Sequence, residues 1–263
     1  MVIPVHDENP TRRTPVVTYL LIAANVVVFL LSPVATHVVG TSAAAQECRQ
    51  LAFFDHYAAK PVELLHNRAL DSGATGRVVR TGGGVGCLVT SPPPYSKSPF
   101  VSVLTAMFLH GGWLHLLGNM LFLFVFGNNV EDRLGRLRFL GFYLVCGYAA
   151  TYGFALFQSS STQPLVGASG AIAGVLGAYL VLYPRARVLS LLTFLFFLPV
   201  RLPAWVVLGS WFLLQYLYFR GAGVAAGSGV AYGAHVVGFV VGAFLVWGLR
   251  SSRAAAPRWS PPG

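Results

Sequence analysis

Long apolar runs constrain the fold of this chain more than any other feature. Residues 165–183 hold no charged side chain, and at about 1.5 Å per residue they are long enough for most of a bilayer core of about 30 Å. Only 10% of the chain is charged, against about 25% in an average soluble domain. We therefore expect an all-α integral membrane protein. Six runs are predicted to span the bilayer, at residues 15–34, 113–129, 139–157, 165–183, 203–219 and 230–249.

These runs give a simple domain organisation. Residues 1–14 form an N-terminal segment, residues 15–249 a membrane domain, and residues 250–263 a tail that is predicted to be disordered. Residues 35–112 are predicted to form a long outer loop between the first two spans, at least partly folded. Residues 188–200 are apolar but too short to cross the bilayer, so we expect an interfacial or re-entrant segment there.

The distribution of positive charge indicates an orientation. The chain holds 18 Lys and Arg against 8 Asp and Glu, which gives a net charge of +10. Arginines gather in short segments beside the spans, which is typical of the positive-inside rule, and we expect no nucleic-acid partner. Both termini are therefore predicted to be cytoplasmic. The abundance of Ala, Gly and Arg favours a multi-pass protein of the bacterial cytoplasmic membrane.

The cysteines leave one question open. Cys48 and Cys87 lie in the predicted outer loop, and they can form a disulfide if that loop faces an oxidising compartment or remain as two free thiols. Cys146 lies within the third span. Their spacing fits no zinc knuckle, and we expect neither a metal nor a cofactor.

Polar side chains inside membrane spans are costly, so each one is a functional candidate. Ser169 lies near the outer end of the fourth span, and His235 near the outer end of the sixth. His115 and Asn119 are four residues apart near the outer end of the second span, so they share one helix face. We expect these four side chains to lie at a similar depth.

This set of side chains suits acyl transfer. Ser169 is the expected nucleophile, and His235 is the base that would take its proton. The N–H group of Ser169 has no partner within its helix, and with His115 and Asn119 it can stabilise an oxyanion. No acidic residue lies in a span near the outer face, so we expect a Ser–His dyad in place of a triad.

Small residues surround the expected nucleophile. Gly167 and Gly170 leave space for a substrate backbone to approach Ser169. Gly238 and Gly242 repeat at helical spacing on the sixth span, and such small faces let membrane helices approach closely. We expect this packing to bring Ser169 within hydrogen-bond distance of His235.

At these residues the chain resembles the rhomboid family of intramembrane serine proteases. The resemblance rests on four motifs within residues 105–248: FLHGGWLHLLGNM, VEDRLGRLRF, GASG and AHVVGFVVG. It implies a six-transmembrane-helix bundle with a long outer loop between helices 1 and 2. It also implies a serine endopeptidase that cuts single-span membrane proteins near the outer membrane face, with a preference for small residues at the cut.

The resemblance also implies roles for individual residues. Ser169 would be the nucleophile, His235 the base, and His115, Asn119 and the Ser169 N–H the oxyanion site. His110 would support the site, and Glu131 and Arg133 would anchor the loop after the second span. The fifth span and the loop before the sixth would act as gate and cap. The chain departs from the family at Val101-Ser102, where many members have Trp-Arg, and at Ala173, where many have Tyr.

Three other functions fit the sequence less well. A non-proteolytic rhomboid-fold protein that binds membrane clients generally lacks the serine or the histidine, whereas this chain has both. A channel or transporter is disfavoured because no span holds an acidic residue and no internal repeat is evident. A metalloprotease is excluded because His110 and His115 are five residues apart and no HExxH motif occurs.

Overall fold

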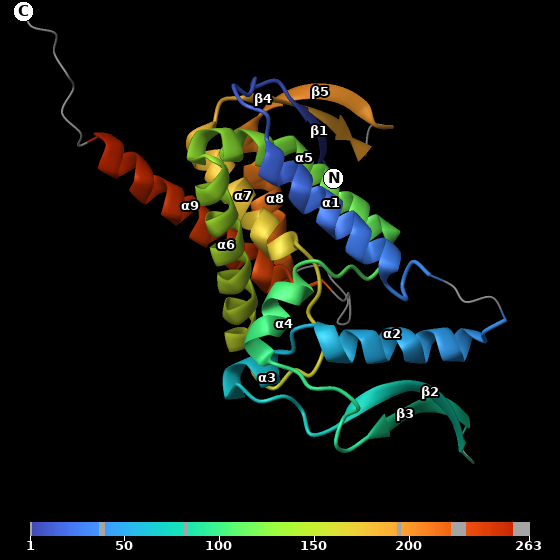
Figure 1. The fold of residues 1–263 in the computed structure, drawn as a ribbon. Helices are drawn as coiled ribbons and strands as arrows, with labels where there is room; N and C mark the ends of the chain where they lie inside the picture. Colours follow the sequence, from blue (N-terminus) through green and yellow to red (C-terminus); the bar gives the residue numbers. More distant parts are fainter. Residues whose placement is uncertain (1, 37–39, 82–83, 194–195, 222–229, 255–263) are drawn as a thin grey trace, which may run out of the picture.

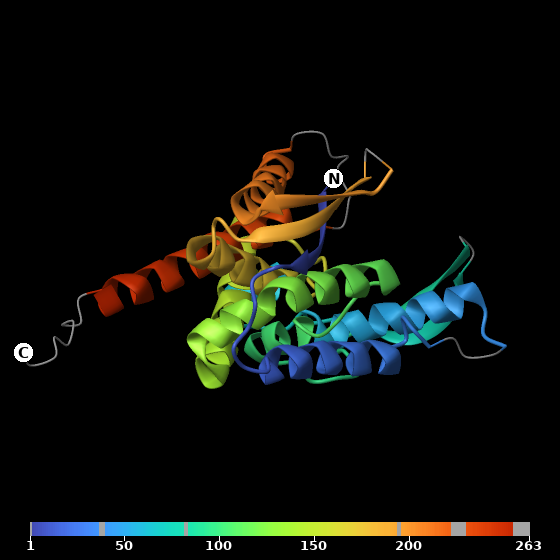
Figure 2. The ribbon, with the colours of Figure 1, turned by 90° about the horizontal axis from the view of Figure 1, so that it is seen from above.

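A computed structural model describes residues 2–36, 40–81, 84–193, 196–221 and 230–254. The described chain is mostly helical, with strands at both ends of a central helix bundle (Figures 1 and 2). The helices are α1 (Val16–Leu31), α2 (Ala43–Tyr57), α3 (Pro61–His66), α4 (Pro99–Ala106), α5 (Trp113–Leu134), α6 (Arg136–Phe157), α7 (Ser169–Leu182), α8 (Ala204–Phe219) and α9 (Tyr232–Ala254). The strands are β1 (Val2–Asp7), β2 (Gly73–Thr81), β3 (Gly84–Thr90), β4 (Arg187–Leu192) and β5 (Leu198–Pro203).

Six apolar helices make up the bundle, one in each predicted span. Among the described residues, α5, α6 and the part of α9 up to Leu249 are long and apolar enough to cross a membrane. Helices α1, α7 and α8 are apolar but shorter. Helix α7 begins at Ser169, later than predicted, because Gly167 adopts a positive φ and ends the preceding turn.

Helix α7 is the buried centre of the bundle, and small residues bring its neighbours close. Its residues from Ala171 to Tyr179 are all buried. A Cβ atom on Gly238 of α9 would overlap the carbonyl oxygen of Gly170, and one on Gly242 would overlap the carbonyl oxygen of Gly174. The α7 and α9 backbones are therefore in direct contact, as expected for small residues at helical spacing.

One carboxylate holds the start of α1 against the end of α5. Glu131 is 2% exposed and accepts hydrogen bonds from the N–H groups of Val17 (3.0 Å) and Thr18 (2.7 Å) and from the Thr18 hydroxyl (2.8 Å). The first N–H groups of a helix lack helical partners and carry partial positive charge, which suits a carboxylate. Arg133 lies on the same turn, and its side chain is exposed.

The expectation of an all-α fold is wrong at the end of the bundle near the α5–α6 turn. Strands β1, β4 and β5 form an antiparallel sheet there, with β4 in the centre. The segment 188–200 was expected to be interfacial or re-entrant; its described residues contribute to β4 and β5, which pair with each other, and its position relative to a membrane stays a prediction. Val188 and Ser190 are fully buried in β4 while neighbouring residues are not, so the segment packs one face on the bundle and pairs its backbone with β1.

The predicted outer loop is a folded region at the opposite end of the bundle. It contains α2, α3, α4 and the β2–β3 hairpin. A disulfide joins Cys48 of α2 to Cys87 of β3, which answers the question that the sequence left open. A buried ion pair links Lys97 to Glu63 at 2.6 Å. Burial lowers the pKa of Lys97, and the bond to Glu63 acts in the opposite direction.

The predicted boundary between the last helix and the disordered tail, at residue 250, lies too early in the chain. Helix α9 continues to Ala254, so residues 250–254 are helical. Residues 255–263 lie outside the described residues.

Candidate active site

Ser169 is presented at the first position of α7 by a glycine turn. Gly167 has a φ of +117°, a conformation that residues with a side chain rarely adopt. Its N–H donates to the carbonyl oxygen of Ala106 at 2.9 Å, which ties the turn to the end of α4. As the first residue of the helix, Ser169 has an N–H group with no partner inside α7.

Ser169 and His235 form a hydrogen-bonded pair. The distance between Ser169 Oγ and His235 Nε2 is 2.9 Å. His235 lies in the first turn of α9 and is 9% exposed. The direct contact between the α7 and α9 backbones fixes this distance, because each side chain lies in the first turn of its helix.

Gln215 of α8 holds the other ring nitrogen of His235. Its Oε1 lies 2.7 Å from His235 Nδ1, and the side chain is 7% exposed. When this oxygen accepts a hydrogen bond, Nδ1 carries the ring proton and Nε2 is left to accept the Ser169 hydroxyl proton. The rings of Trp211 and Tyr232 lie 5.9 and 6.3 Å from the imidazole. Gln215 was not among the predicted site residues, although a polar side chain inside a predicted span was a sufficient signal.

His115 and Asn119 lie beside the turn that precedes Ser169. A Cβ atom built on Gly167 would stand 2.8 Å from His115 Nε2 and 3.6 Å from Asn119 Nδ2. Gly111 donates its N–H to His115 Nδ1 at 3.4 Å, so the proton of the neutral ring is on Nε2. Both side chains therefore present N–H donors near the Ser169 N–H.

His110 is buried behind these two residues. It is 1% exposed, and its Nε2 lies 2.9 Å from Asn119 Nδ2. Its ring packs edge-on against the ring of His115, with centroids 5.0 Å apart. An amide nitrogen carries two hydrogens, so Asn119 can bond His110 and still donate into the site.

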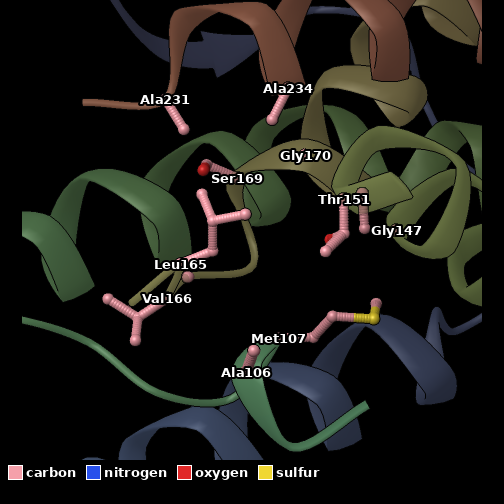
Figure 3. A pocket seen from close by; sticks show the side chains of 12 residues that line it. Ala106, Met107, Gly147, Thr151, Leu165, Val166, Ser169, Gly170, Ala231 and Ala234 are labelled. Carbon is pink, nitrogen blue, oxygen red and sulfur yellow. The ribbon is translucent and has the colours of Figure 1, made fainter. Parts of the chain in front are cut away.

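Two cavities meet at Ser169. The larger has a volume of about 540 Å³ and is lined by all the polar residues described above except His110: Ser169, His235, Gln215, His115 and Asn119. The smaller has a volume of about 30 Å³ and lies between the ends of α4, α7 and α9 (Figure 3). Figure 3 shows Ala106 and Met107 on one side of it and Ala231 and Ala234 on the other.

Gly170 shapes the packing beside Ser169. A Cβ atom at this position would stand 2.7 Å from the Cβ of Ala150 on α6. The residue must therefore stay small for α6 and α7 to pack as they do. Within the part of the chain that the structure describes, no group of three His, Cys, Asp or Glu residues is placed to hold a metal ion.

The arrangement is that of a nucleophile, an oriented base and a set of fixed donors, which together can carry out acyl transfer. Comparison with known proteins identifies the family. The rhomboid domain matches residues 97–252, which is more than half of the chain. The chain belongs to the rhomboid family.

Several rhomboid relatives align with parts of the chain. Rhomboid protein 1, mitochondrial, of Saccharomyces cerevisiae is 33% identical over 153 residues, which cover 56% of this chain and 41% of the yeast protein. RHOMBOID-like protein 6, mitochondrial, of Arabidopsis thaliana is 36% identical over 107 residues, which cover 38% and 34% of the two chains. A Bacillus subtilis protein provisionally named rhomboid protease YdcA is 40% identical over 82 residues, which cover 30% and 39%. The chain thus spans less than half the length of each of these relatives.

These comparisons correct the expected location. A bacterial cytoplasmic membrane, with both termini in the cytoplasm, was predicted from composition and arginine placement. That predicted location is wrong, because the yeast and Arabidopsis relatives are both named as mitochondrial. Apolar spans and arginine-rich segments obey the same physics in any bilayer, so composition does not distinguish the two membranes.

Proposed function

We propose that this rhomboid protein is an intramembrane serine endopeptidase that hydrolyses peptide bonds of membrane-spanning proteins. The observation that carries the proposal is the chain of contacts from Ser169 Oγ to His235 Nε2 and from His235 Nδ1 to Gln215. It supplies a nucleophile, a base beside it, and a partner that holds the base in the tautomer that can accept a proton.

The reaction proceeds in two halves. Ser169 Oγ attacks the peptide carbonyl carbon while His235 takes the hydroxyl proton, and His235 then donates that proton to the leaving nitrogen. A water molecule next attacks the acyl group on Ser169 with His235 again as base, and the serine hydroxyl reforms. The large cavity reaches both side chains, and it gives the substrate and the water a common route.

The negative oxygen formed in each half needs donors that are already in place. The Ser169 N–H at the positive end of α7, His115 Nε2 and Asn119 Nδ2 are the groups that we assign to it. His110 supports this set through its bond to Asn119. Donors fixed by the fold cost no reorganisation when the charge develops, which is why their positions matter more than their number.

The small cavity favours a small substrate side chain at the cut. Its volume of about 30 Å³ suits a methyl group or a single water molecule, and no larger side chain fits without movement. Met107 and Thr151 close it on the sides away from Ser169 (Figure 3). Alanine or glycine at the cleaved bond is therefore the preferred class of substrate.

The proposed membrane layout has all six bundle helices crossing the bilayer. Helix α7 starts at Ser169 and ends near β4, so the active site faces away from the arginine-rich end. Cleavage is expected near that opposite membrane face, beside the folded outer region. The names of two relatives favour a mitochondrial membrane as the place of this activity.

Cleavage of a model single-span substrate in liposomes tests the proposal. The native protein should cut it, and Ser169→Ala and His235→Ala should each reduce cleavage to the background rate. Ser210→Ala is the matched control, because Ser210 is exposed on α8 and its hydroxyl donates within its own helix to the Val207 carbonyl oxygen. Cleavage that survives Ser169→Ala, or a folded native protein that binds such substrates without cutting any, would contradict the proposal.

A further inference from the structure

Two adjoining cavities lie at the arginine-rich end of the bundle, far from Ser169. The first has a volume of about 730 Å³, and four arginines line it: Arg12, Arg13, Arg133 and Arg138. The second has a volume of about 540 Å³ and shares Arg13 and Arg138 with the first. It adds Arg136 and the apolar side chains of Pro15 and Leu137.

Positive charge in the first cavity is not balanced by the protein. Its single carboxylate, Asp132, faces four guanidinium groups. None of the four arginines takes part in an ion pair among the described residues. Asp132 Oδ2 already accepts the N–H of Arg12 at 3.2 Å, and the nearby Glu131 is occupied by the start of α1. The cavity therefore has several guanidinium groups available for an anion.

The cavities lie where apolar helix surface gives way to polar loops. Helix α1 begins at Val16, α5 ends at Leu134 and α6 begins at Arg136, so three helices of the bundle end here. Leu137, at the rim of the second cavity, is 86% exposed, and Tyr19 on the outer face of α1 is 47% exposed. A ligand here would meet charge on one side and lipid-facing apolar surface on the other.

We propose that these cavities bind the headgroup of an anionic phospholipid. The phosphodiester would lie among Arg12, Arg133 and Arg138, whose planar guanidinium groups match phosphate oxygens in pairs. The glycerol and the start of the acyl chains would lie over Leu134 and Leu137 in the second cavity. Basic pockets at helix ends on the positive side of a membrane protein suit this ligand class.

The adjoining apolar rim favours a lipid over a soluble phosphate compound. A free phosphate ester would use the arginines alone, and it would gain nothing from Leu137. A diacyl lipid uses both cavities and is held at this depth by its tails. The proposal concerns binding only, so it stands or falls independently of any protease activity.

Native mass spectrometry of the purified protein tests the proposal. The protein is titrated with phosphatidylglycerol, and phosphatidylcholine of the same chain length serves as the uncharged comparison. Arg133→Gln with Arg138→Gln should weaken phosphatidylglycerol binding about 25-fold, at about fivefold for each arginine. Arg185→Gln with Arg187→Gln is the matched control, because it removes the same charge from exposed sites outside both cavities. It should change binding by no more than about twofold, since long-range attraction is screened.

Three results would overturn the proposal. Equal weakening by the two double variants would mean diffuse surface attraction and no site. Displacement of the lipid by millimolar glycerol phosphate would mean that the occupant is a soluble phosphate compound. If the cavity variant does not fold, a photoactivatable phosphatidylglycerol is crosslinked to the native protein instead, and labelling outside residues 9–20, 129–138 and 182–183 would likewise contradict the site.

Discussion

The α7–α9 contact and the α1–α5 contact solve the same packing problem by opposite means. Helices α7 and α9 pack closely because glycine has no side chain. Gly238 and Gly242 let the backbone atoms of the two helices touch. Helices α1 and α5 are joined at one end by a buried charge, the carboxylate of Glu131. The first contact holds Ser169 and His235 at hydrogen-bond distance, whereas the second lies at the other end of the bundle.

The difference shows where geometric precision is needed. A backbone contact cannot change by a rotamer, so it suits a pair of residues that must stay 2.9 Å apart. A carboxylate that accepts several hydrogen bonds tolerates small shifts, and it suits a helix that has only to be docked. We therefore expect changes at the glycine contact to affect catalysis, and changes at Glu131 to affect stability.

The glycine contact should be the more sensitive of the two. Gly238→Ala places a methyl group against the Gly170 carbonyl, so α7 and α9 must separate and Ser169 must move relative to His235. A shift of about 1 Å at reacting groups can reduce the rate about 100-fold. The measurement is kcat on the model substrate in liposomes. Gly141→Ala, where a methyl group meets nothing within 4 Å, should retain full activity, and a fully active Gly238→Ala would break the comparison.

At the other contact, Glu131→Gln should lower the free energy of unfolding by about 2 kcal/mol, because the charged acceptor at the start of α1 is lost. Unfolding in SDS–detergent mixtures measures it. Asp132, next in the chain, accepts one hydrogen bond among the described residues, from the Arg12 N–H, so Asp132→Asn should have less than half of this effect. If Glu131→Gln instead reduced kcat of the folded protein as much as Gly238→Ala does, the two ends of the bundle would be coupled.

The smallest effect is expected at Gln215. A change there tests whether the orientation of His235 matters in addition to its distance from Ser169. Gln215→Leu keeps the volume but removes the oxygen that His235 Nδ1 contacts, and loss of one buried hydrogen bond predicts a decrease in kcat of about tenfold. KM should not change, because substrate binding does not depend on the ring tautomer. Gln215→Glu retains an oxygen acceptor and should recover most of the activity. A Gln215→Leu variant whose KM rises while kcat is unchanged would show that Gln215 contacts substrate instead.

The candidate site residues could be named from the sequence because a membrane makes polar residues conspicuous. Ser169, His115, Asn119 and His235 are polar side chains in otherwise apolar runs, and topology alone put them at one depth. Gln215 was not predicted because the usual partner of a catalytic histidine is an acidic residue. A neutral amide contacts His235 Nδ1 here, and it adds no charge to an apolar helix bundle.

The strands were missed for a different reason. In a span, the length of an apolar run predicts a helix, but β4 lies in a short apolar run and pairs with β1, which is far away in the sequence. No local pattern identifies that partner. The outer region shows the same limit, because the pairing of Cys48 with Cys87 depends on how α2 packs against the β2–β3 hairpin. Helix positions were predictable from local composition, whereas strand pairing was not.

Strand β1 also makes this sheet depend on contacts between distant parts of the chain. Val2 pairs with Leu192 and Asp7 with Val188, so β1 and β4 come from opposite ends of the described chain. Helix α1 likewise depends on a distant partner, because Val17 and Glu131 are 114 residues apart. Contacts between residues so far apart in the sequence carry a loop-closure cost that local helical contacts do not. We therefore expect the three-stranded sheet to form later in folding than the helices that it covers.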